Sequence, residues 1–169
     1  DPVSRFLPEL ESMQVLTGGT ADRPLLATAG TPITLNHLFT HTAGFYYDFV
    51  DDPVLAELFE RAKLDEAEDL ERFVKRAAAL PLKHQPGEAF TYGINTSILG
   101  RVVEVVSGQP FGQFLEDRIF QPLGMADTGF SVPEENRDRL ARIYHLEDGR
   151  LVASEASFAT WPEEGRGPE

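Results

Sequence analysis

The sequence contains no cysteine among its 169 residues. Disulfides, thiolate metal ligands and cysteine nucleophiles are therefore excluded, and cysteine usage does not indicate a redox compartment. The compartment stays open, with the cytoplasm slightly favoured. No apolar run approaches the ~18 residues of a membrane span, and the amino terminus lacks a charged segment followed by an apolar one. We therefore expect a soluble protein without a membrane partner.

Basic residues are also scarce. The chain has 15 lysines and arginines against 28 acidic residues, which gives a formal net charge of −13. A field of this sign repels phosphate backbones and anionic lipid surfaces instead of attracting them. Nucleic acid is therefore not an expected partner.

Several catalytic motifs are missing as well. The sequence has neither a Gly-x-Ser-x-Gly nucleophile elbow nor a glycine-rich phosphate loop. Its only lysines are Lys63, Lys75 and Lys83, and none of them follows a serine by three residues. A serine nucleophile that uses a lysine base must therefore lie outside this chain.

The length and the 41% hydrophobic content suit one globular domain that buries roughly 70% of the surface of its unfolded chain. We divide the chain into a turn-rich entry with short strands over 1–34, a helical region over 35–130, and a hairpin and loop over 131–169. This organisation predicts an α+β fold that is mostly helical, with short strands and hairpins at both ends.

Local signals place the first two long helices. Asp52-Pro53 combines an N-capping acid with a helix-initiating proline. Asp65 and Glu68 can form a capping box for the next helix, which must end before Pro81. The residues expected on the buried face of that helix are Leu70, Phe73, Val74 and Ala77.

Two further elements are predicted toward the carboxyl end. A helix that ends at a Gly108 cap is expected to bury one broad apolar face, made of Ile98, Leu99, Val102, Val103 and Val106. A following helix is expected to turn one side inward, made of Phe111, Phe114, Leu115 and Ile119. Asp148-Gly149 lies between two alternating runs and predicts a hairpin.

His37 and His41 lie four residues apart on an expected helix, a spacing that lets two imidazoles reach one metal ion. The glutamate of a zinc-protease helix is missing between them, and no third ligand is obvious. We therefore interpret them as a structural pair and expect neither a metal site nor a cofactor. Asn95-Thr96-Ser97 matches a glycosylation pattern, but it lies in an expected helix, so we interpret the match as chance.

Tyr92 lies at the corner between a Pro86-Gly87 turn and a helical run. A free phenol has a pKa near ~10, so it relays protons near neutral pH only beside positive charge. The nearest cations, Arg101 and Lys83, are more than two helical turns away and across a proline turn, respectively. The local sequence alone therefore predicts a packed tyrosine whose hydroxyl caps a helix or binds a carbonyl group.

Four segments change this interpretation. They are LFTHTAGF (38–45), LPLKHQPGEAFTYG (80–93), ILGRVVEVVSGQPF (98–111) and IFQPLGMADTGF (119–130). In order and spacing they resemble the β-lactamase-related serine hydrolase family, which includes class C β-lactamases, DD-peptidases and family VIII carboxylesterases. The resemblance covers nearly the whole chain and implies the helical-domain portion of a β-lactamase/transpeptidase-like fold.

The resemblance also implies a catalytic role for parts of this chain. In this family a Ser-x-x-Lys motif supplies the nucleophile and its base, and a tyrosine of the helical domain completes the proton network. Tyr92 matches that tyrosine. Tyr46 or Tyr47 is expected to line the acyl pocket. The chain is thus expected to be a fragment that begins just after the serine motif and is inactive alone.

One departure from the family pattern bears on the substrate. Ile94 occupies the position where β-lactamases and peptidases of this group usually carry an asparagine that contacts an acylamino side chain. The resemblance therefore favours cleavage or transfer of a small-molecule carboxylic ester. The alternatives are β-lactamase or DD-peptidase activity, a catalytically inactive ligand- or peptide-binding module, and a stand-alone helical interaction domain. The sequence indicates neither the natural substrate nor the oligomeric state.

Overall fold

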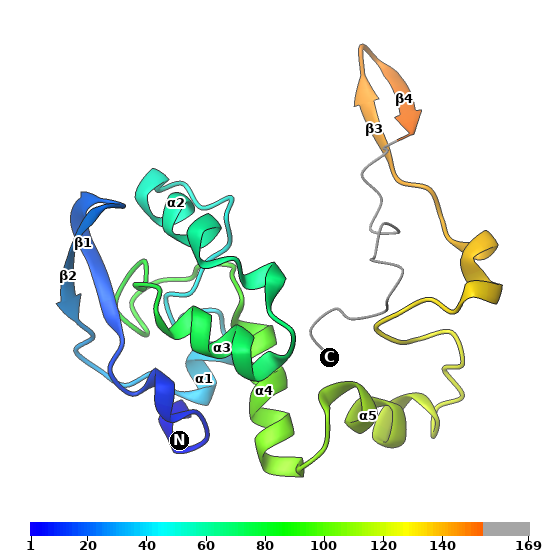
Figure 1. The fold of residues 1–169 in the computed structure, drawn as a ribbon, viewed down its shortest axis with the longest axis horizontal. Helices are drawn as coiled ribbons and strands as arrows, with labels where there is room; N and C mark the ends of the chain where they lie inside the picture. The colour runs from blue at the N-terminus through cyan, green and yellow to red at the C-terminus, as the bar shows by residue number, and fades with distance from the viewer. Residues whose placement is uncertain (154–169) are drawn as a thin grey trace.

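The computed structural model of the chain describes residues 1–153. Residues 154–169, which end the segment predicted as hairpin and loop, lie outside the described residues. Helices dominate the described part, and one short antiparallel hairpin lies near each end (Figure 1). The predicted α+β fold, mostly helical with hairpins at both ends, is therefore confirmed.

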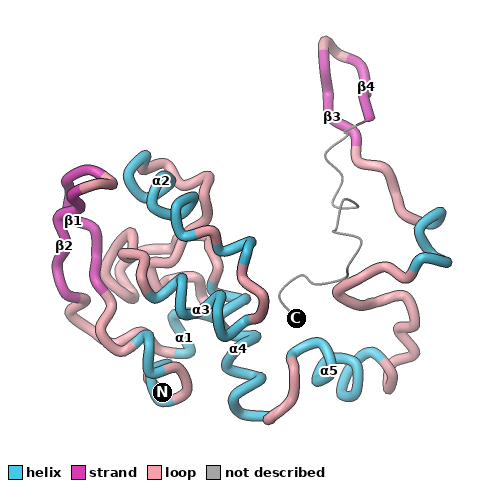
Figure 2. Tube along the Cα trace, viewed as in Figure 1, coloured by secondary structure: helices cyan, strands magenta, loops and turns pink. Residues whose placement is uncertain are grey.

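The helices are short, and long loops connect them (Figure 2). In chain order they are α1 (Leu35–Phe39), α2 (Pro53–Ala62), α3 (Leu70–Ala78), α4 (Asn95–Ser107) and α5 (Phe111–Leu115), which continues into the π-helical turn η4 (Glu116–Phe120). The 3-10 turns are η1 (Val3–Arg5), η2 (Pro8–Leu10), η3 (Leu64–Glu66) and η5 (Glu134–Arg139). Helix α4 packs against α1, α3 and α5. Within residues 1–153, no helix combines the length and the apolar character needed to cross a membrane.

The amino-terminal hairpin is tied to a segment from much later in the chain. Its strands are β1 (Gln14–Thr20) and β2 (Arg23–Thr28), which pair antiparallel. On the other edge of β1, the amide of Leu16 donates to the carbonyl of Leu82 at 2.9 Å, and the amide of Leu82 donates to the carbonyl of Gln14 at 2.7 Å. These two bonds fix the start of the loop that leads from α3 to Tyr92.

Of the two N-caps predicted for α2 and α3, the first is confirmed and the second is wrong. Asp52 caps α2 as predicted, because its carboxylate accepts hydrogen bonds from two amides of the first turn. The capping box expected at Asp65 is wrong, since Asp65 lies within the turn η3. The cap of α3 is Asp69 instead, which accepts from the amide of Arg72 at 2.6 Å.

Replacing Asp69 by alanine should lower the free energy of unfolding by about 1 kcal/mol at neutral pH, because the first turn of α3 loses its acceptor. The hydrogen bond from the Arg72 amide, with the charge of the Arg72 guanidinium, lowers the pKa of Asp69. A carboxylate with a lowered folded-state pKa stabilises fully above its unfolded-state pKa and loses that contribution as the pH falls through the folded-state value. Denaturant titrations at neutral and acidic pH should show the difference between variant and wild type shrinking in acid.

The mispredicted cap provides the matched control for this experiment. Asp65 is exposed and makes no side-chain hydrogen bond within the described part of the chain. The Asp65→Ala variant should therefore stay within about 0.5 kcal/mol of wild type at every pH. Equal losses in the two variants would contradict the assignment of Asp69 as the cap.

The hydrophobic core of the described chain lies entirely between Val3 and Val102. All four residues predicted for the buried face of α3 are buried, which confirms that amphipathic pattern. The broad face predicted for α4 is only partly correct. Ile98 and Val102 are buried, but Val106 is 66% exposed because α4 leaves the core after Val102. Gly108 caps the helix in the left-handed conformation, as predicted.

Beyond α4 the chain is largely exposed. In the helix that α5 and η4 form, none of the four residues predicted to face inward is fully buried. The carboxyl-terminal hairpin of β3 (Tyr144–Glu147) and β4 (Arg150–Ala153) is exposed along its length and lies away from the other elements (Figure 1). Its predicted turn is confirmed, because Asp148 and Gly149 both have positive φ, as a type I′ turn requires.

Candidate active site

Two segments distant in the sequence meet beside Tyr92. Segment 41–47 follows α1, and segment 83–94 leads into α4. Their backbones are joined by hydrogen bonds from Lys83 N to Gly44 O at 2.9 Å, from Gly87 N to Thr42 O at 2.8 Å, and from Thr91 N to His41 O at 2.9 Å. Because the last of these bonds involves the residue before Tyr92, it fixes the start of the corner.

Gly93 allows the two backbones to approach each other directly after Tyr92. A Cβ atom on Gly93 would lie 2.4 Å from the carbonyl oxygen of Phe45 and 2.5 Å from the amide nitrogen of Tyr46. Both neighbours are backbone atoms, so they cannot move aside by a change of rotamer. The corner at Tyr92 therefore depends on the absence of a side chain at position 93.

Tyr92 is not the packed residue that its local sequence predicts. The residue is 58% exposed, and within residues 1–153 its hydroxyl makes no hydrogen bond to another residue. The ring lies between two others. The imidazole of His41 stacks on it at 5.1 Å between centroids and 28° between planes, and the ring of Tyr47 is tilted against it at 5.4 Å. Contacts with His41 and Tyr47 thus hold the ring of Tyr92, while much of the residue is exposed at the surface.

The two tyrosines predicted to line an acyl pocket differ in their surroundings. Tyr46 is only 2% exposed, packs against Phe59, and has a buried hydroxyl with no hydrogen-bond partner among the described residues. Burial, with the nearby negative charge of Asp52, raises its pKa. Tyr47 is partly exposed, and burial together with the adjacent Tyr92 raises its pKa. Of the pair, Tyr47 is the one that contacts Tyr92; the binding role of both stays a prediction.

Two exposed phenylalanines extend this group of rings, and the sequence interpretation missed both. Phe49 stacks on Tyr47 at 5.4 Å and is 70% exposed, while Phe90 lies 5.9 Å from His41 and is 68% exposed. We call the five rings of Phe90, His41, Tyr92, Tyr47 and Phe49 the aromatic row. The sequence does carry a signal for these two residues, because aromatic residues cluster in FYYDF (45–49) and in FTY (90–92).

The cations considered for Tyr92 are engaged elsewhere. Lys83 forms an ion pair with Asp51, and its hydrogen bond lowers the pKa of that carboxyl group. Arg101 binds Glu71 at 2.8 Å and Glu104 at 3.0 Å. Within residues 1–153, therefore, neither of these two cations supplies the positive charge that a phenol needs to act as a proton relay.

Both histidines of the pair have partners within the described part of the chain. His37 completes a capping box with Thr34 at the start of α1. Nδ1 of His41 lies 3.0 Å from the side-chain amide nitrogen of Asn95, which is itself fully buried. In the part of the chain that the structure describes, no three histidine, aspartate or glutamate side chains cluster as a metal site would require.

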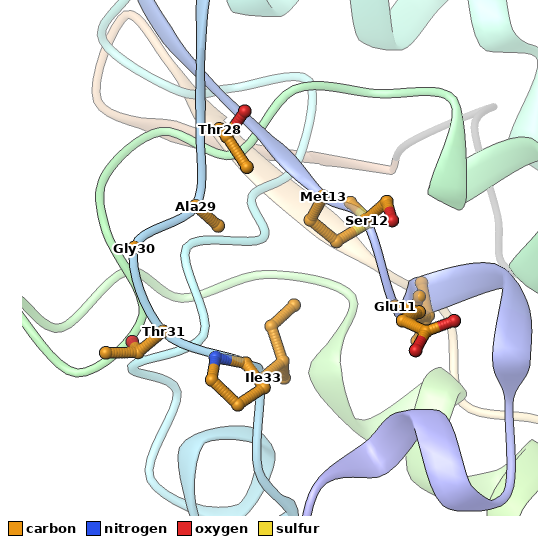
Figure 3. Close-up of a pocket in the computed structure, with 10 residues that line it drawn as sticks. Glu11, Ser12, Met13, Thr28, Ala29, Gly30, Thr31 and Ile33 are labelled. Carbon is orange, nitrogen blue, oxygen red and sulfur yellow. The ribbon is translucent and has the colours of Figure 1, made fainter.

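A separate hollow of about 190 Å³ lies near the base of the amino-terminal hairpin (Figure 3). It is formed by residues 10–13, which begin at the last residue of η2, and by residues 28–33, which begin at the last residue of β2. Its polar side chains are those of Glu11, Ser12, Thr28 and Thr31, and the lining contains no histidine, lysine or tyrosine. None of the predicted site residues contributes to it, so the candidate site remains the aromatic row around Tyr92.

Comparison with known proteins supports the resemblance noted in the sequence. The Beta-lactamase family matches residues 1–167. Lovastatin esterase of Penicillium rubens is 40% identical over 146 residues, which cover 85% of this chain and 36% of that protein. Monacolin J acid methylbutanoyltransferase of Aspergillus terreus is 36% identical over 143 residues, which cover 84% of this chain and 34% of that protein.

The fold comparison agrees. The unliganded structure of simvastatin synthase (LovD) from Aspergillus terreus matches with a TM-score of 0.73 and 34% identity, over 91% of this chain and 40% of that one. The chain thus spans between 34% and 40% of the length of these three relatives. Because the family match covers nearly the whole chain and the fold agrees with it, this chain belongs to the β-lactamase-related family of serine hydrolases.

Proposed function

We propose that this chain forms the tyrosine-bearing part of a longer serine hydrolase that cleaves or transfers carboxylic esters through an acyl-serine intermediate. The observation that carries the proposal is the exposed phenol of Tyr92, held between His41 and Tyr47 on a corner fixed by backbone hydrogen bonds. Relatives named as an esterase and as a methylbutanoyltransferase support chemistry at an ester bond.

In this mechanism the nucleophilic serine and its lysine base come from outside the 169 residues. The serine hydroxyl adds to the ester carbonyl carbon while its proton passes to the base. The bond to the leaving alcohol then breaks, and Tyr92 donates a proton to the departing alkoxide, which leaves an acyl-serine. Water or a second alcohol then gives a proton to the Tyr92 phenolate and adds to the acyl carbon, the bond from that carbon to the serine oxygen breaks, and the lysine returns a proton to the serine, so the product is an acid or a new ester. The lysine ammonium supplies the positive charge that favours phenolate at Tyr92.

The aromatic row supports an uncharged, apolar substrate. Phe49 and Phe90 place exposed rings on either side of the Tyr92 corner, and Tyr47 borders the phenol directly. The net charge of −13 disfavours anionic substrates. We therefore assign Tyr47 to the acyl-binding surface, and Tyr46 to the packing beneath it. Ile94 is 2% exposed and carries no amide that could hold an acylamino group, which supports esters over β-lactams.

The complete gene product that contains these residues should hydrolyse p-nitrophenyl butyrate and, with an added alcohol, form the butyrate ester of that alcohol. Release of nitrophenolate measures hydrolysis, and chromatography of the products measures transfer. Mass spectrometry of the quenched protein should find a butyryl group on one serine. A chromogenic β-lactam is the matched comparison substrate, and we expect its turnover to be slower by about two orders of magnitude or more.

Two results would contradict the proposal. A complete protein that turns over the β-lactam faster than the ester would transfer the assignment to β-lactamase activity. A folded complete protein that binds apolar esters without cleaving them would support a non-enzymatic binding module instead. Reading the upstream coding sequence for Ser-x-x-Lys separates an enzyme from a non-enzymatic module before any assay.

A further inference from the structure

His41 has an unusual backbone conformation directly after α1. Its φ of 53° lies in the left-handed region, which most side chains adopt only with strain and which glycine or asparagine tolerates better. The same turn directs its carbonyl oxygen to the amide of Thr91, at 2.9 Å. Glycine could make this turn without a side chain, so the geometry of the turn alone does not account for an imidazole here.

The imidazole itself has three neighbours. It stacks on Tyr92, it lies 5.9 Å from Phe90, and its Nδ1 atom is 3.0 Å from the amide nitrogen of Asn95. An amide nitrogen can only donate, so Asn95 is the donor and Nδ1 of His41 is the acceptor in this contact. Asn95 is 0% exposed and starts α4. The orientation of the imidazole plane is therefore set by a buried residue of the helix that follows Tyr92.

Resting on the proposed function, we propose that His41 is a positioning residue that fixes the Tyr92 phenol for proton transfer. Its ring stacks on the Tyr92 ring, and the ring of Tyr47 also lies against it in a tilted contact. A tyrosine with more than half of its side chain exposed would otherwise sample several rotamers, and proton relay requires the hydroxyl at one place. Asn95 acts through His41 by fixing the angle of the imidazole.

Two substitutions of His41, made in the complete gene product, separate this role from a purely structural one. His41→Asn keeps a residue that tolerates the left-handed turn and can bond Asn95, but it removes the ring. His41→Phe keeps a flat ring against Tyr92, but it strains the turn and gives Asn95 no acceptor. We expect the asparagine variant to keep its melting temperature and lose about tenfold or more in kcat with little change in KM. The phenylalanine variant should melt at a lower temperature and keep more of its kcat.

We therefore predict that the more stable variant is the less active one. A purely structural role would instead make activity follow melting temperature in both variants. That result, with the phenylalanine variant the less active, would overturn the inference. A double variant, Tyr92→Phe with His41→Asn, should be no slower than Tyr92→Phe alone, since no hydroxyl remains to be positioned. A further loss in the double variant would also contradict the inference.

The outcome of Tyr92→Phe separates this inference from the proposed function. If that variant keeps its activity, the relay role and the positioning role fall together. If it loses its activity while both His41 variants follow their melting temperatures, the relay stands and only the positioning role of His41 is overturned.

Discussion

Replacing Tyr92 by phenylalanine should lower the acylation rate of the complete enzyme by about two to four orders of magnitude while the protein stays folded. The substitution removes one oxygen that makes no hydrogen bond within residues 1–153, and it keeps the ring that stacks on His41 and contacts Tyr47. The free energy of unfolding should therefore change by no more than about 0.5 kcal/mol. Stopped-flow measurement of the nitrophenolate burst reports acylation, and thermal unfolding reports the fold.

Tyr144 provides the control for this experiment. It is a second exposed tyrosine, on β3, far along the chain from the aromatic row. Tyr144→Phe removes the same atom and should leave acylation unchanged. Near-normal acylation in the Tyr92 variant, or an equal loss in the Tyr144 variant, would remove the phenol of residue 92 from the mechanism.

Replacing Gly93 by alanine adds one methyl group, and it should destabilise the chain far more than the same change at Gly30. The new Cβ atom would meet the Phe45 carbonyl oxygen at 2.4 Å and the Tyr46 amide nitrogen at 2.5 Å, so the two backbones must separate. Overpacking against backbone atoms in a buried position costs about 3 kcal/mol or more. For a domain of this size, the melting temperature should fall by about 10 °C.

Activity should fall together with stability in the Gly93 variant, because separation of the backbones moves Tyr92 away from Tyr47. Gly30→Ala is the matched control. A Cβ atom on Gly30 would lie 3.6 Å from its closest neighbour, the side-chain oxygen of Gln85, and the residue has no positive φ. The control should melt within about 2 °C of wild type. A Gly93 variant as stable as the control would show that the corner tolerates a side chain.

Features that depend on neighbouring residues could be predicted from the sequence. The cap at Asp52, the buried face of α3 and the Asp148-Gly149 turn each follow from a few adjacent side chains, and each is confirmed. The fold family needed more than local signals, since it came from four motifs in register. The buried face of α4 was predicted too long, because periodicity does not show where a helix leaves the core. Val106 keeps the apolar spacing but is 66% exposed in the described chain.

The candidate site was the least predictable part, because its contacts join residues about fifty positions apart. The resemblance pointed to Tyr92, but no local pattern indicates that His41 and Tyr47 hold its ring. In the sequence, Asn95 stands out only as part of a glycosylation pattern, and we interpret that match as chance. In the structure its side chain is buried and bonds His41. Long-range pairing of this kind depends on tertiary structure, which residue types and spacing do not specify.

The three hydrogen bonds between segments 41–47 and 83–94 also determine where the chain tolerates insertions and deletions. Helices α2 and α3 lie between these segments. The entropic cost of closing a loop rises only slowly with the length of the loop. Insertions in the turns around these helices can therefore accumulate without displacing Tyr92. A one-residue deletion between Gly87 and Thr91 would shift the pairing and rotate the tyrosine out of place. Length variation among homologues should thus be common between residues 48 and 80 and rare between residues 83 and 93.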